Sequence, residues 1–65
     1  MMLNYQVYKD TKTEWRWRLK AENGKIIADS GEGYINQTDC LYAIKLVQSS
    51  VDARIDIQKT YVRGN

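Results

Sequence analysis

Apolar and polar residues alternate over several stretches of the chain, and this pattern predicts antiparallel β-strands. The alternation is clearest in residues 14–21, where tryptophan, leucine and alanine share one face and glutamate, arginine and lysine share the other. Residues 3–8 alternate in the same way, and residues 25–30 are predicted as a third strand. Such alternation is typical of a strand with one face on a core and the other in water.

Polar segments between these stretches predict the turns. In residues 9–13 we expect the Asp10 side chain to hydrogen-bond to the nearby backbone. The pair Asn23 and Gly24 predicts a two-residue type I′ hairpin turn, because these residue types adopt positive φ at the lowest cost. The Ser-Gly-Glu-Gly segment of residues 30–33 is expected to end the third strand with a bulge.

The second half of the chain predicts a helix and then another strand. Asn36 is a typical N-cap, and residues 37–49 carry apolar side chains at helical spacing. Residues 53–61 alternate again and are predicted as a fourth strand. The expected fold is therefore one α+β domain over residues 1–65, in the order β-β-β-α-β, with one helix packed on one face of an antiparallel sheet.

The small size of the chain makes self-association an expected source of stability. Its single cysteine excludes a disulfide within one chain, and the absence of histidine argues against a zinc site. A helix of about 13 residues is about 20 Å long and 10 Å wide, so it covers roughly half of one face of a four-stranded sheet about 19 Å across. We therefore expect a homodimer in which the helices and a joint sheet cover each other.

The composition of the chain limits which cellular compartment and which partners are expected. No apolar run is long enough for a membrane helix, so no membrane partner is expected, and the one free thiol suits a reducing cytoplasm. Ten basic and eight acidic residues give a net charge of +2, which is too small to indicate nucleic-acid binding by itself. We expect no cofactor and no metal.

The Trp-Arg-Trp-Arg segment permits two interpretations. In the first, the tryptophans belong to the core and the arginines form a solvated face opposite acidic residues such as Asp29. In the second, a basic stripe with one aromatic ring binds the phosphates and stacks on a base of a nucleic acid. The candidate residues of this stripe are Arg16, Arg18, Lys20 and Tyr8. The first interpretation is favoured because acidic residues interleave with the basic ones.

The Ser-Gly-Glu-Gly-Tyr segment is a second candidate, either as a ligand loop or as the site of a small enzyme. Its residues are Ser30, Gly31, Glu32, Gly33 and Tyr34. Glycine N–H groups can bind an anion, and the carboxyl and phenol groups can act as acid and hydrogen-bond donor. Phosphate-binding glycine motifs are longer and open directly into a helix, so a bulge is the favoured interpretation. Cys40 is predicted as a core residue, because it lies on the apolar helical stripe and no histidine is present to activate it.

Several segments together resemble the YegP-like family of small, mostly bacterial proteins of uncharacterised function. The resemblance lies in Tyr-Lys-Asp at 8–10, WRWRLKA at 15–21, Asn-Gly at 23–24, IIADSGEGY at 26–34, and the helical residues Cys40, Ile44 and Val47. It implies a β3-α-β unit that pairs with a second unit and exchanges C-terminal strands, here between two chains. Family members often have glycine where this chain has Thr13, and proline where it has Val51. The resemblance implies no known reaction or ligand, so we expect a non-enzymatic binding or accessory module.

Overall fold

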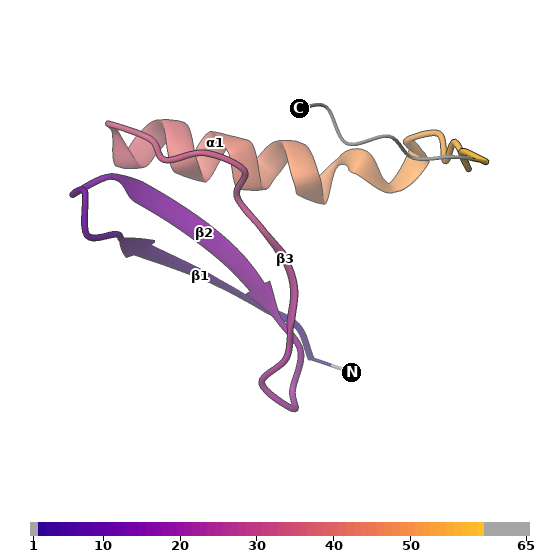
Figure 1. Cartoon of the computed structure of the whole chain (residues 1–65), viewed down its shortest axis with the longest axis horizontal. Coiled ribbons are helices and arrows are strands. Elements are labelled where there is room, and N and C mark those ends of the chain that lie inside the picture. The colour runs from indigo at the N-terminus through magenta and orange to yellow at the C-terminus, as the bar shows by residue number, and fades with distance from the viewer. Residues whose placement is uncertain (1, 60–65) are drawn as a thin grey trace.

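The computed structural model describes residues 2–59, which form a three-stranded sheet with one helix on one face (Figure 1). The strands are β1 (Asn4–Lys9), β2 (Trp15–Lys20) and β3 (Ile26–Asp29), and the helices are α1 (Gln37–Gln48) and the short 3-10 helix η1 (Ser50–Asp52). Both strand pairs are antiparallel, in the order β1-β2-β3. The predicted α+β class, the strand meander and the helix are confirmed.

The register of β1 and β2 divides their side chains between two faces. Asn4 pairs with Lys20 and the pairing continues without a shift to Lys9 and Trp15. Trp17 of β2 is buried together with Cys40 and Ile44 of α1, and half-buried apolar residues of all three strands pack around them. Tyr5 meets Trp17 edge-on, with ring centroids 5.8 Å apart. Trp17 Nε1 is buried, and within residues 2–59 it has no hydrogen-bond acceptor.

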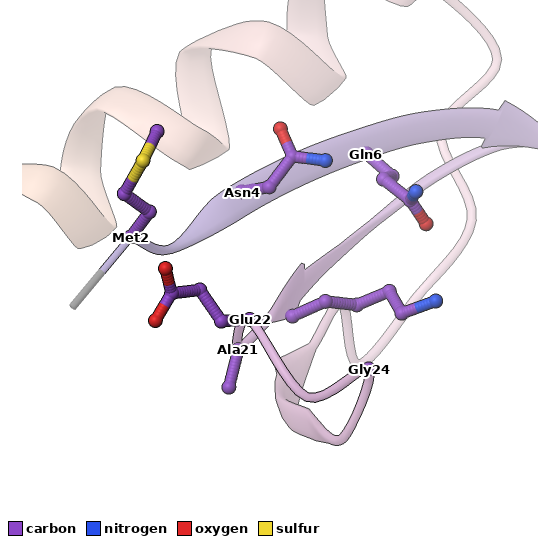
Figure 2. A pocket seen from close by; sticks show the side chains of 7 residues that line it. Met2, Asn4, Gln6, Ala21, Glu22 and Gly24 are labelled. Atoms are coloured by element: carbon purple, nitrogen blue, oxygen red, sulfur yellow. The ribbon is translucent and has the colours of Figure 1, made fainter.

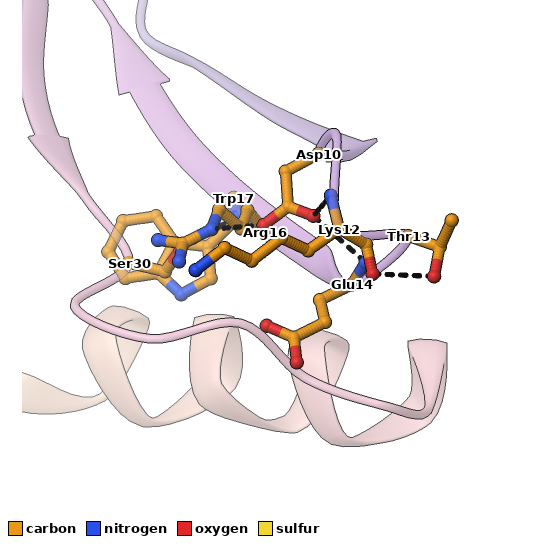
Figure 3. A network of polar contacts seen from close by, with 7 residues as sticks. All are labelled: Asp10, Lys12, Thr13, Glu14, Arg16, Trp17 and Ser30. Atoms are coloured by element: carbon orange, nitrogen blue, oxygen red, sulfur yellow. Dashed lines mark hydrogen bonds and ion pairs between the residues drawn. The ribbon is translucent and has the colours of Figure 1, made fainter.

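The turn between β1 and β2 is built on the Asp10 side chain, as the sequence predicts. Asp10 Oδ1 accepts hydrogen bonds from the backbone N–H groups of Lys12 and Glu14, at 2.8 and 3.0 Å (Figure 3). Thr13 has a φ of 61°, in the left-handed region that β-branched residues rarely adopt. This is the position at which the resemblance to YegP-like proteins implies glycine.

The hairpin between β2 and β3 differs from the predicted type I′ turn. The N–H of Gly24 donates to the carbonyl of Ala21 and the N–H of Ala21 donates to the carbonyl of Lys25, each at 2.9 Å. Gly24 has a φ of 87°, whereas Asn23 keeps a negative φ. The loop therefore has three residues and ends in a left-handed glycine, which is the next most common hairpin form. The Asn23 side chain instead accepts the N–H of Lys25.

The helix begins directly after Asn36, whose extended backbone (φ −106°, ψ 137°) fits the predicted N-cap position. Its side chain does not cap the helix, however, and instead donates to Asp39 Oδ2 at 3.4 Å. At the other end, the N–H of Ser49 donates to the carbonyl of Lys45. The last helical residue is Gln48, one position before the predicted end.

The predicted fourth strand does not form in the single chain. Residues 53–59 lie in irregular backbone, and residues 60 and 61 of the prediction lie outside the described range. The physical reason is the geometry of α1, which carries the chain beyond the sheet, so that residues 53–59 have no strand edge beside them (Figure 1). Ile55 and Ile57 are consequently 85% and 92% exposed.

Candidate binding surface

The outer face of the sheet, opposite α1, carries the predicted basic stripe. Arg16 lies next to the turn, and its Nε donates to Asp10 Oδ2 at 2.7 Å (Figure 3). The N–H of Glu14 and the guanidinium of Arg16 hold the pKa of Asp10 below its ordinary value. Arg16 is therefore engaged in an ion pair that stabilises the turn.

Arg18 is held by two residues of the neighbouring strand. Its Nε donates to Gln6 Oε1 at 2.8 Å, and its guanidinium carbon lies 4.8 Å from the ring centroid of Tyr8. Arg18 also stands opposite Asp29 of β3 in the strand register. The guanidinium thus covers a face of the ring that a nucleic-acid base would need, which does not favour the nucleic-acid interpretation.

Lys20 lies at the hairpin end of the same face and lines an open pocket of about 390 Å³. Figure 2 shows Asn4 and Gln6 of β1 on one side of this pocket, Ala21, Glu22 and Gly24 of the hairpin on the other, and Met2 at one end. The stripe is therefore continuous along the sheet, but its members have different roles. Arg16 and Arg18 are hydrogen-bonded to side chains of the protein itself, whereas Lys20 lines the pocket.

The Ser-Gly-Glu-Gly-Tyr segment is hydrogen-bonded to β2 through the backbone of its first and last residues. Ser30 is 6% exposed, its N–H donates to the carbonyl of Trp17 at 2.9 Å, and its Oγ accepts the N–H of Trp17 at 3.3 Å. After the two glycines, Tyr34 pairs with Trp15 through two backbone hydrogen bonds of 2.7 and 2.8 Å. The segment is a break in the third strand with renewed pairing after it, as the favoured interpretation predicts.

The side chains of this segment do not converge on a shared site. Glu32 is exposed, whereas Tyr34 is half-buried against the core. Burial, followed by the charge of Glu32, raises the pKa of the Tyr34 phenol, so the phenol keeps its proton more firmly. A β-carbon at Gly33 would lie 2.8 Å from that of Glu14, which explains why a glycine is present there. The pocket of Figure 2 is lined by none of these residues.

Cys40 is a core residue, as predicted. Its exposure is 0%, and burial raises the pKa of its thiol. The thiol lies in the cluster with Trp17 and Ile44, away from the surface that carries the pocket. Residues 2–59 also contain no group of three histidine, cysteine or acidic side chains close enough to hold a metal ion.

Sequence reasoning missed the neutral residues of the pocket, Asn4 and Gln6, and its acidic residue, Glu22. Asn4 and Gln6 alternate with core residues of β1, so their face was predictable. Their closeness to Lys20 follows only from the strand register, which pairs Asn4 with Lys20 and Gln6 with Arg18.

No helix in residues 2–59 has the length and apolar character that would let it cross a bilayer.

The fold and this surface define a small α+β protein whose outer sheet face is polar and carries an open pocket at its hairpin end. Residues 10–56 match the family described as "Domain of unknown function (DUF1508)". A UPF0339 protein of Neisseria meningitidis serogroup B is 49% identical over 49 residues, which cover 75% of this chain and 86% of that protein. The chain therefore belongs to the DUF1508 family, and its resemblance to YegP-like proteins is confirmed.

The chain is also similar to two further proteins. A UPF0339 protein of Stutzerimonas stutzeri, described as lying in the 5′ region of the ptx operon, is 39% identical over 54 residues, which cover 80% of this chain and 48% of that protein. A protein from Haloferax volcanii with a solution NMR structure is 34% identical, with a TM-score of 0.78 over 86% of this chain and 93% of that one. The likeness in fold therefore covers most of both chains.

Proposed function

We propose that the protein works as a homodimer with exchanged C-terminal strands, and that this dimer is a non-enzymatic binding or accessory module. The segment after α1 carries the proposal. Residues 53–59 have the alternation of a strand, yet their apolar face lies in water, with Ile55 and Ile57 almost fully exposed. Burying one isoleucine side chain contributes about 1.5–3 kcal/mol, so a partner that covers both is strongly favoured.

The free edge of β1 is the better acceptor for a strand from a second copy. β1 has six residues that pair with β2 without a register shift, and its other edge is open. β3 has four residues and a register shift opposite Leu19 and Lys20. An added strand therefore gains more regular backbone hydrogen bonds along β1 than along β3.

Two observations support a second copy as the occupant. Leu3, just before β1, and Leu46 of α1 are 49% and 53% exposed, and a second subunit that covers them would bury further apolar surface. In addition, the 54-residue match spans only 48% of the Stutzerimonas stutzeri relative, which leaves room for a second unit in that chain. A tandem pair in one chain and a homodimer of single units meet the same need.

The non-enzymatic part of the proposal rests on the Ser-Gly-Glu-Gly-Tyr segment. The backbone of its first and last residues, Ser30 and Tyr34, pairs with Trp17 and Trp15, and its only carboxylate is exposed on the loop. Such a segment stabilises the sheet and does not present an acid, a base and a nucleophile to one point.

Sedimentation at micromolar concentration tests the dimer. The expected particle has twice the 7.6 kDa mass of the chain. The double variant Ile55→Asp, Ile57→Asp is expected to be a monomer, because it places charge on the apolar face of the exchanged strand. Gln58→Asp, on the opposite face of the same segment, serves as the control and is expected to remain a dimer. A wild-type monomer would contradict the proposal.

A spin label on Gln58→Cys, in chains without ¹⁵N, tests the acceptor edge. Mixed with unlabelled ¹⁵N chains, it is expected to broaden the amide signals of β1 (Asn4–Lys9) more than those of β3 (Ile26–Asp29). Cys40 is fully buried and does not compete for the label under native conditions. Stronger broadening of β3 would move the exchanged strand to the other edge.

A further inference from the structure

We propose that the pocket at the hairpin end of the outer sheet face binds a small zwitterion, such as a free α-amino acid with an apolar side chain. This inference rests on the proposed binding module and gives its ligand class. The pocket holds about 390 Å³, within the range of about 300–1,000 Å³ typical of small-molecule sites. It lies on the face opposite α1, so a strand added at the edge of β1 leaves this face open.

One side of the pocket presents hydrogen-bond donors that are positioned in advance. Gln6 Oε1 accepts the Arg18 Nε–H at 2.8 Å, which leaves the amide NH₂ of Gln6 as a pair of donors. Arg18 is itself held over the Tyr8 ring, and its hydrogen bond restrains the Gln6 amide. Lys20 stands opposite Asn4 in the strand register and adds a positive charge to the same wall. Donors with one positive charge match a carboxylate.

The hairpin side of the pocket presents the opposite charge. Glu22 lies across the pocket from Asn4 and belongs to the loop that joins β2 and β3 (Figure 2). Neither ion pair found in residues 2–59 involves Lys20 or Glu22, so both charges remain available to a ligand. A plain anion would be repelled by Glu22 and a plain cation by Lys20. A ligand with one charge of each sign satisfies both groups.

Apolar groups complete the lining. Met2 lines one end of the pocket and Ala21 lies on its hairpin side (Figure 2). A short hydrocarbon side chain on the ligand can contact both, and methionine adapts to side chains of different shape. These contacts favour an amino acid with an apolar side chain over glycine and over an amino acid with an acidic side chain.

Amide chemical shifts in a ¹⁵N NMR titration test the proposal, with L-leucine as the probe. Leucine is expected to shift the amide signals of Asn4, Gln6 and residues 20–24. Two analogues divide its chemistry: 4-methylpentanoate lacks the ammonium group and 3-methylbutylamine lacks the carboxylate. Each is expected to bind up to about fivefold more weakly than leucine, the effect of one exposed ion pair. Equal binding of leucine and 4-methylpentanoate would overturn the zwitterion assignment and indicate a simple anion site.

Matched variants locate the two charges. Lys20→Gln is expected to weaken leucine binding up to about fivefold without weakening the binding of 3-methylbutylamine. Glu22→Gln is expected to weaken leucine binding by a similar factor without weakening the binding of 4-methylpentanoate. Lys25→Gln makes the same charge change outside the pocket and is expected to leave binding unchanged. Leucine shifts that both pocket variants leave unaltered, or no shifts at the solubility limit, would refute the site. Sedimentation of the same samples separates the two proposals: a dimer without leucine shifts refutes the pocket alone, and a monomer with them refutes the assembly alone.

Discussion

Thr13→Gly is expected to stabilise the protein. The φ of 61° at Thr13 places a β-branched residue in the left-handed region, at a cost of about 1–2 kcal/mol. Glycine removes this cost but adds about 0.5–1 kcal/mol of chain entropy in the unfolded state. The Thr13 hydroxyl donates to the carbonyl of Lys12 at an exposed position, so its loss has little effect. The net gain is roughly 0.5–1 kcal/mol, which corresponds to a rise of about 2–8 °C in Tm for a domain of this size.

Thermal unfolding followed by tryptophan fluorescence, at one fixed protein concentration, measures this gain. Thr13→Ala is the control, because alanine lacks the branch and the hydroxyl but keeps the β-carbon that is disfavoured at positive φ. Gly24→Ala tests the same cost of a β-carbon at positive φ by adding one where the protein has none. Gly24 has a φ of 87° and open space where a β-carbon would lie, so alanine is expected to cost about 1 kcal/mol through the backbone alone. A Thr13→Gly protein no more stable than Thr13→Ala would refute strain in this turn.

Three other predictions concern the turn, the strand break and the core. Gly33→Ala is expected to cost about 1–3 kcal/mol in urea unfolding, because its β-carbon would lie 2.8 Å from that of Glu14; Glu14→Gly should relieve this cost and Glu14→Ala should not. Asp10 has a pKa below its ordinary value of 3.8, so the stability it contributes is present above pH 3.8 and is lost as the pH falls through the lower folded-state pKa. Urea midpoints measured against pH should therefore converge for wild type and Asp10→Asn in acid, and parallel curves would contradict the assignment. Cys40 is expected to react with a thiol reagent only on unfolding, and stoichiometric labelling of the native protein would show that it is accessible.

The sequence predicted those parts of the fold that depend on local pattern. Alternation in β1 and β2 correctly divided Trp17 from Arg16 and Arg18, because a regular antiparallel pair keeps its two faces distinct along its length. The core position of Cys40 followed from helical spacing for the same reason.

Features that depend on the wider structure were less predictable. Asn23 and Gly24 fit two hairpin forms, and the pairing of Ala21 with Lys25 selected the three-residue loop. The alternation of residues 53–59 describes what a strand could bury but not which edge it joins. The pocket depends on the register of β1 against β2, which the sequence alone does not give.

The buried indole of Trp17 bears on why this strand carries so large a residue. Its N–H has no acceptor within residues 2–59, and a buried donor without a partner lowers stability by about 1–3 kcal/mol. The packing of the large ring in the core therefore has to offset the cost of its unpaired polar atom. A sheet covered by one 12-residue α-helix encloses few atoms, and one bicyclic side chain set edge-on against Tyr5 occupies the space that several aliphatic residues fill in a larger interior.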